Sequence, residues 1–122
     1  MWQIRVCRRH AVRKGGEIMK RIYISLPISG HEDTYEQRLD DAVEYVKEMY
    51  PEYERIITQK EVAERLENYK PNKLKYKDYM LAYLKEIRHC DAIFMCQGWH
   101  DSSGCYAEWA LAWAIELTIL YK

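Results

Sequence analysis

Hydrophobic and polar residues follow one another along the chain in a pattern that predicts strands separated by helices. Short runs rich in β-branched and aromatic residues indicate strands at 21–26 and 54–58. A mostly apolar run at 91–96 indicates a buried strand, and residues 118–121 can form a last one. We therefore expect strands that alternate with helical segments.

The segments between these strands carry helical signals. Thr34 with Gln37 predicts a capping box that opens a first helix, which ends before Pro51, and Thr58 with Glu61 predicts a second box. Apolar residues at helical spacing mark the first helix (Leu39, Ala42, Val43, Val46, Met49), the third (Tyr76, Met80, Leu84, Ile87) and the last (Ala107, Ala110, Leu111, Ala114).

Alternating strands and helices predict an α/β fold with a parallel sheet and helices on both faces. Right-handed crossovers favour a doubly wound sheet of about four to five strands in the order 2-1-3-4. Ligands bind such sheets beyond the carboxyl ends of the strands, where the winding reverses. The loops expected there are Pro27–Asp33 and Gln97–Ser103, so we predict that they meet beside the start of the last helix.

Composition limits the class of protein. The chain has 122 residues, of which 48% are hydrophobic, so it is long enough for one domain with a core. No apolar run is long enough to span a membrane. Residues 1–18 are basic and contain Gly15-Gly16; we interpret them as a non-native leader or a disordered basic arm, with Met19 as the natural start and 19–122 as the domain. A targeting arm or a nucleic-acid tail are the alternatives.

Outside that basic segment the chain holds 14 basic and 18 acidic residues, which argues against a nucleic-acid polymer as partner. The four cysteines form no CxxC pair and no signal peptide is visible, which favours a reduced, cytoplasmic protein. The gaps between the His and Cys residues at 89–105 fit no common zinc pattern. We therefore predict buried thiols and no metal site.

One carboxylate stands out in the last helix. Between Gly104 and Leu117 only Glu108 and Glu116 carry charge, and Glu108 lies in the first turns of an otherwise apolar helix. Such a position is costly unless the carboxylate has a partner or a chemical role. Glu108 can attack an anomeric carbon and form a glycosyl ester, or it can simply compensate the helix dipole. Burial raises its pKa and the helix N-terminus lowers it, and the sequence leaves open which prevails.

The loop before that helix suits an anion. Ser102, Ser103 and Gly104 supply hydroxyls and close backbone approach at a helix start, with Ser29-Gly30 in the facing loop, although a serine there can also serve only as a cap. Trp99 and His100 can stack on a base or donate protons, or can be rim residues. Trp109 and Trp113 pack in the core or against a second subunit, so we favour a homodimer or higher homo-oligomer.

These residues resemble the nucleoside 2-deoxyribosyltransferase-like superfamily, and within it domain-of-unknown-function family 4406. Three matching pieces occur in order: Tyr23-Ile24-Ser25-Leu26-Pro27-Ile28-Ser29-Gly30, then Cys90-Asp91-Ala92-Ile93 with Gly98-Trp99, then Ser102-x-Gly104-x-x-x-Glu108 with Ala112. The resemblance spans about Met19 to Lys122. It implies a flavodoxin-like sheet and cleavage of the N-glycosidic bond of nucleosides or nucleoside 5′-monophosphates, by hydrolysis or transfer, without a cofactor.

The resemblance also implies roles for single residues. Glu108 matches the nucleophile, and Ser102 matches a phosphate-binding serine of the monophosphate hydrolases. The substrate-binding set that it implies is Ser25, Pro27, Ile28, Ser29, Gly30, Gly98, Trp99, Ser102, Ser103 and Gly104. The second catalytic acid of the family is an Asp, and its position is occupied here by Tyr83; Asp78, Glu86 or Asp101 are the candidate substitutes, none of them in register. Because a general acid contributes about a hundredfold or more, the alternative function is a non-catalytic nucleotide-binding module, of phage or defence type.

Overall fold

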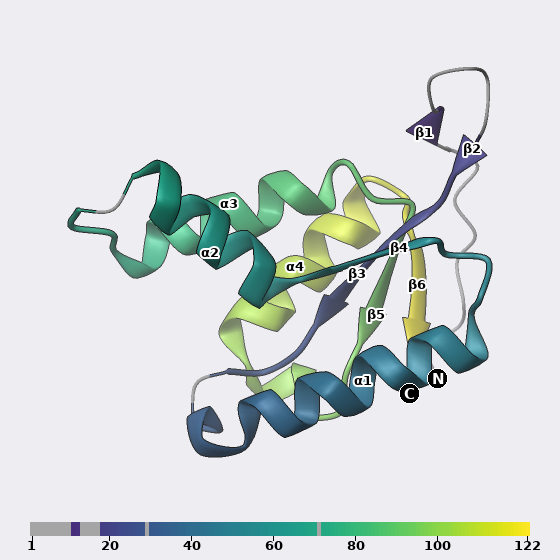
Figure 1. Cartoon of the computed structure of the whole chain (residues 1–122), viewed down its shortest axis with the longest axis horizontal. Coiled ribbons are helices and arrows are strands. Elements are labelled where there is room, and N and C mark those ends of the chain that lie inside the picture. Colours follow the sequence, from purple (N-terminus) through teal and green to yellow (C-terminus); the bar gives the residue numbers. More distant parts are fainter. Residues whose placement is uncertain (1–10, 13–17, 29, 71) are drawn as a thin grey trace.

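A four-stranded parallel sheet forms the centre of the computed structural model, which describes residues 11–12, 18–28, 30–70 and 72–122 (Figure 1). Its strands are β3 (Arg21–Ser25), β4 (Arg55–Thr58), β5 (Ala92–Met95) and β6 (Thr118–Tyr121). They lie in the order β4-β3-β5-β6, with every neighbouring pair parallel. The predicted order 2-1-3-4 and the doubly wound α/β class are confirmed.

Two short strands precede this sheet. Strand β1 (Ala11–Val12) pairs antiparallel with β2 (Ile18–Met19) in a separate two-stranded sheet. Most of the segment interpreted as a leader, namely residues 1–10 and 13–17, lies outside the described residues. Its interpretation as non-native stays a prediction.

Helices cover both faces of the sheet, as Figure 1 shows. On one face lies α1 (Tyr35–Met49); on the other lie α2 (Gln59–Tyr69), α3 (Tyr76–Ile87) and α4 (Ser103–Ala114). Successive strand residues point to opposite faces. Ile22 and Ile24 therefore pack in the core cluster under α1, while Tyr23 packs in the cluster under the other three helices.

The two predicted capping boxes have different outcomes. The capping box predicted from Thr34 and Gln37 is wrong, because the Thr34 side chain does not cap α1. The Thr34 hydroxyl instead donates to the His31 carbonyl in a 3-10 turn, η1 (Glu32–Thr34), ahead of the helix. Thr58 Oγ1 does accept from the amide of Glu61 at 3.1 Å. The carboxylate of Glu61 pairs with Arg55 and Arg65.

The buried face of α4 differs from the predicted stripe. Ala107, Ala110 and Ala114 are exposed, and Leu111 is only partly buried. The buried residues are Cys105, Glu108 and Ala112. Because this helix is apolar nearly all round, periodicity alone does not define its inner face. The carboxylate turns inward because Tyr23 and Ser25 of β3 donate hydrogen bonds to it.

The described part of the chain lacks two features. No helix there combines the length and apolar character that a membrane crossing needs. No group of three or more His, Cys, Asp or Glu side chains gathers there in an arrangement that could hold a metal ion.

Candidate active site

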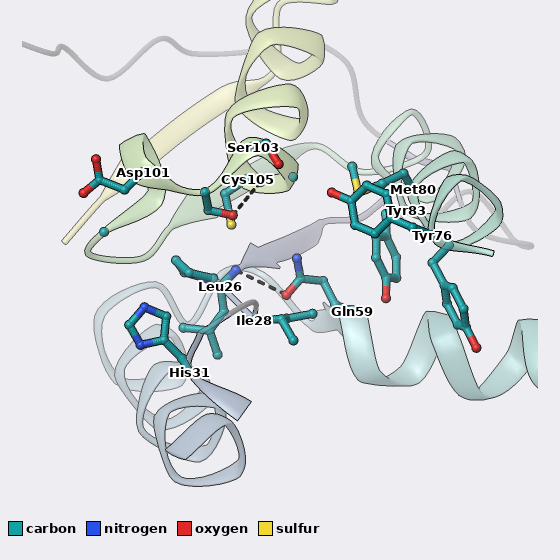
Figure 2. Close-up of a pocket in the computed structure, with 15 residues that line it drawn as sticks. Leu26, Ile28, His31, Gln59, Tyr76, Met80, Tyr83, Asp101, Ser103 and Cys105 are labelled. Carbon is teal, nitrogen blue, oxygen red and sulfur yellow. Dashed lines mark hydrogen bonds between the residues drawn. The ribbon is translucent and has the colours of Figure 1, made fainter. Parts of the chain in front are cut away.

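A pocket of about 400 Å³ opens at the carboxyl ends of the strands, between the loop after β3, α3 and the start of α4 (Figure 2). Four segments line it: the loop after β3, the start of α2, one side of α3, and the turn that leads into α4. The lining residues are Leu26, Pro27, Ile28, His31, Gln59, Tyr76, Tyr79, Met80, Tyr83, Gly98, Asp101, Ser102, Ser103, Gly104 and Cys105. The predicted meeting of the loops after β3 and β5 beside α4 is confirmed.

The backbone brings these two loops together. The amide of Cys96 donates to the carbonyl of Ser25 at 3.0 Å, which extends the pairing of β3 and β5 beyond their last residues. Gly98 then turns the chain at a φ of 88°, a conformation that glycine adopts without a steric penalty. Arg38 of α1 donates to the Pro27 carbonyl at 3.0 Å. Both loops are thereby tied to the helices and strands around them.

The pocket faces the N-terminus of α4. Ser102 caps this helix, since its Oγ accepts from the amide of Cys105 at 3.2 Å. The amides of Ser103 and Gly104 precede that one in the first turn, where backbone donors have no acceptor within the helix. A Cβ added at Gly104 would lie 3.1 Å from the Tyr76 hydroxyl, so α3 approaches closely here. The capping role expected as one alternative for Ser102 is confirmed, and the next two residues, Ser103 and Gly104, line the pocket.

Glu108 lies behind the pocket wall with no exposed surface. Its Oε2 accepts from the Tyr23 hydroxyl at 2.7 Å, and its Oε1 accepts from Ser25 Oγ at 2.6 Å. The amide of Gln59 donates to both oxygens, at 3.2 and 3.4 Å. Because these three groups are uncharged, the carboxylate is oriented by neutral hydrogen bonds from two elements, β3 and the start of α2.

Burial raises the pKa of Glu108 from 4.5 to about 7, although the hydrogen bonds from Ser25, Tyr23 and Gln59 each act in the opposite direction. Desolvation prevails because it penalises the charged form and the described partners add no positive charge. The side chain therefore ionises near neutral pH, which is the range in which a carboxylate serves as a titratable reactive group.

The predicted site residues differ in their position relative to the pocket. Pro27, Ile28, Tyr83, Gly98, Asp101, Ser102, Ser103 and Gly104 line the pocket, and Ser25 and Glu108 lie behind its wall. Gly30 is exposed and does not line the pocket. Ser29 lies outside the described residues.

Trp99 does not take either position expected for it. It lies in η2 (Trp99–Asp101), is only 4% exposed, and does not line the pocket. Its ring stacks on His100, with centroids 3.8 Å apart, and on Trp109, with centroids 5.3 Å apart. Trp99 is therefore a core residue that supports the loop and is neither a rim residue nor placed to stack on a base. The thiols of Cys90, Cys96 and Cys105 are free and buried, as predicted.

Of the four candidates for a second acid, two are engaged elsewhere. Asp78 accepts from the amide of Lys75 at 2.8 Å, and Glu86 pairs with Arg65 at 2.7 Å. Tyr83 and Asp101 both line the pocket. Burial, followed by the charge of Glu108, raises the pKa of Tyr83 to about 12, so its phenol is protonated at neutral pH.

Sequence reasoning missed Gln59 and the hydroxyl of Tyr23. Both carried a signal. Gln59 directly follows β4, so it lies at the carboxyl end of the strand beside β3, where polar residues meet ligands. Tyr23 is two residues from Ser25 in one strand, and so points to the same face of the sheet.

Comparison with known proteins supports the same fold. A solved structure, "2-desoxiribosyltransferase from Leishmania mexicana", superimposes with a TM-score of 0.57 at 19% sequence identity. The match covers 84% of this chain but 63% of that protein, so this chain spans less than two thirds of its length. No curated protein matches the chain.

Residues 20–121 match the family described as "Domain of unknown function (DUF4406)". The chain therefore belongs to this family and has a nucleoside 2-deoxyribosyltransferase-like, flavodoxin-like fold.

Proposed function

We propose that this protein cleaves the N-glycosidic bond of a nucleoside or nucleoside 5′-monophosphate, with Glu108 as the nucleophile. The observation that carries the proposal is the position of this carboxylate. It is the buried charged group of α4, it is oriented by three donors, and it lies directly behind a pocket that opens at the switch point of the sheet. The similarity to a deoxyribosyltransferase fold supports the same class of substrate.

The reaction has two displacement steps. A lone pair of the Glu108 carboxylate attacks C1′ of the sugar, and the C1′–N bond breaks with its electron pair passing to the base. The base takes up a proton as it leaves. Water, or a second base, then attacks C1′ of the glycosyl ester, which releases the Glu108 carboxylate, and the proton lost by the attacking group returns to the group that protonated the first base. Water as acceptor gives hydrolysis, and a base gives transfer.

Tyr83 is our candidate for the group that protonates the departing base. Its side chain lines the pocket, is 7% exposed, and holds its proton at neutral pH. Asp101 also lines the pocket but is exposed. A side chain shielded from water keeps a proton for transfer to substrate better than one in bulk solvent.

The start of α4 suits a 5′-phosphate. Ser102, Ser103 and Gly104 line the pocket there, and the first turn of this helix contains no acidic residue to repel an anion. On the side of α3 the wall is made of Tyr76, Tyr79 and Met80, which offer apolar and aromatic surface to a base. The pocket thus offers a polar end and an aromatic end to a nucleotide.

The test is release of free base. The purified protein is incubated with a panel of nucleosides and 5′-monophosphates, and the base is followed by chromatography. We expect the unaltered protein to release base from at least one monophosphate and Glu108→Gln to release none, while Glu44→Gln, a change at an exposed position of α1, retains activity. Saturable binding without release of base by the unaltered protein would instead support the non-catalytic nucleotide-binding module.

The quaternary structure and the cellular location remain predictions. Tyr106 and Trp113 of α4 are 49% and 45% exposed, and we propose that this part of the helix contributes to a homodimer or higher homo-oligomer. Light scattering coupled to size-exclusion chromatography measures the mass directly; a monomer at working concentration contradicts the proposal. Cytoplasmic location is proposed from the reduced thiols alone.

A further inference from the structure

The carboxylate of Glu108 and the pocket do not touch directly. Glu108 has no exposed surface and is absent from the pocket lining. Of its three described hydrogen-bond donors, Tyr23 and Ser25 are fully buried strand residues, whereas Gln59 lines the pocket. Gln59 therefore reaches from the pocket wall to the carboxylate. A sugar whose C1′ approaches Glu108 from the pocket meets the Gln59 amide first.

Gln59 is also held on its other side. Its Oε1 accepts from the amide of Leu26 at 3.3 Å, in the loop after β3 (Figure 2). One planar amide thus spans the start of α2, the loop after β3 and the carboxylate of α4. In this position the amide donates to the carboxylate of Glu108 and accepts from the backbone N–H of Leu26, a residue that itself lines the pocket.

The hydrogen bonds of Glu108 are unequal. Those from Tyr23 and Ser25 are short, at 2.7 and 2.6 Å. Those of Gln59 lie between 3.2 and 3.4 Å, at or beyond the upper end of the usual range, and one NH₂ group serves both carboxylate oxygens. Gln59 is therefore the partner that the carboxylate loses at least cost, while Tyr23 and Ser25 keep it oriented.

We propose that Gln59 is a gating side chain over Glu108. In the free protein the Gln59 amide covers the Glu108 carboxylate and accepts a hydrogen bond from the Leu26 N–H. When a sugar enters, the amide turns away, the carboxylate reaches C1′, and the Leu26 N–H becomes a donor for the ligand. The inference rests on the proposed function, because a gate matters only if Glu108 meets a substrate.

The test compares two variants of Gln59. They separate its shielding of the Glu108 carboxylate from water from the hydrogen bond that it donates to that carboxylate. Gln59→Ala removes both the cover and the donor, whereas Gln59→Leu removes the donor and keeps the bulk. The readout is the pKa of Glu108, from NMR titration of protein carrying ¹³C at the glutamate side-chain carboxyl carbon, with the resonance assigned by its loss in Glu108→Gln.

The two variants are expected to shift this pKa in opposite directions. Burial is the largest cause of the raised pKa of Glu108, and the Gln59 hydrogen bond is the smallest of the opposing causes. Loss of the cover admits water, so Gln59→Ala lowers the pKa; loss of the donor alone raises it in Gln59→Leu. A rise in both variants, or no change in Gln59→Ala, overturns the gate and leaves Gln59 as an ordinary hydrogen-bond donor.

Three further measurements complete the test. Gln37→Ala, at an exposed glutamine bonded to Asp41, controls for substitution itself and is expected to leave the pKa unchanged. Gln59→Asn, with an amide one methylene shorter, is expected to shift it less than Gln59→Ala. Ribose 5-phosphate added to the unaltered protein is expected to move the amide resonances of Gln59 and Leu26; unmoved resonances at saturation contradict the gate. The titrations need no turnover, so they remain informative even if no base is released.

Discussion

The phenol of Tyr23 donates a hydrogen bond of 2.7 Å to Oε2 of Glu108, although 85 residues separate the two in the sequence. Both side chains are fully buried. The bond connects the first strand of the main sheet with the helix that bounds the pocket. Desolvation, followed by the charge of Glu108, raises the pKa of Tyr23, so its proton stays on the phenol. The pair therefore acts as a fixed donor and a titratable acceptor.

Removal of this donor is expected to affect both stability and titration. Tyr23→Phe leaves one carboxylate oxygen with only the weak Gln59 contact, at a cost of about 1–3 kcal/mol in the free energy of unfolding. It also raises the pKa of Glu108, because the Tyr23 hydrogen bond lowers it. Urea unfolding and NMR titration measure the two effects. Tyr69→Phe, at a side chain that is 83% exposed, is the matched control; equal effects in both variants contradict the prediction.

Stability and activity are expected to depend on pH in opposite directions. The ordinary pKa of a glutamate side chain is 4.5, and the pKa of Glu108 in the folded protein is about 7. The folded state therefore binds the Glu108 proton more tightly than the unfolded state does. The resulting stabilisation, about 3 kcal/mol, is fully present below pH 4.5 and is lost as the pH rises to 7. Activity needs the ionised carboxylate, and so increases as the pH rises through 7.

The variant Glu108→Gln isolates this contribution, because a glutamine does not titrate. The unfolding free energy of the unaltered protein minus that of Glu108→Gln, measured at several pH values between 4 and 8, is expected to fall between pH 4.5 and 7 and to level off above pH 7. If the unfolding free energies of the two proteins depend on pH in the same way, the pKa of Glu108 is not raised on folding and the prediction is wrong.

Two helix caps offer a matched test of phosphate binding. Ser102→Ala and Thr58→Ala each remove a side-chain oxygen that accepts from a backbone amide, in α4 and α2 respectively. Each is expected to cost about 1 kcal/mol of stability. Only Ser102 lines the pocket, so only Ser102→Ala is expected to weaken binding of a 5′-monophosphate relative to its nucleoside. Calorimetric titration with both ligands measures this difference, and an equal loss in the two variants contradicts a phosphate role.

Protonation of the departing base gives a further prediction. Tyr83→Phe is expected to lower the rate of base release about a hundredfold or more, and Asp101→Asn to change it little. A 7-methylpurine nucleoside, whose cationic base leaves without taking up a proton, is expected to react equally with Tyr83→Phe and the unaltered protein. If that substrate is slowed as much as the others, Tyr83 acts in binding and not as the acid.

The sequence alone determined the strands and their order, the pocket-forming loops, and the identity of the carboxylate in α4. These follow from local properties: β-branched runs, helix-breaking prolines, small residues in turns, and the handedness of crossovers. A charged residue within an apolar helix is conspicuous for the same reason, because the cost of burying it can be judged from its neighbours in the chain.

Only the tertiary structure decided which side of α4 faces inward, and which groups surround Glu108. Tyr23, Ser25 and Gln59 come from β3 and from the end of β4, and they meet the carboxylate only after the sheet has formed. The raised pKa of Glu108 and the burial of Trp99 have the same origin. Desolvation and long-range hydrogen bonds depend on which segments pack together, and the spacing of residues along one helix does not contain that information.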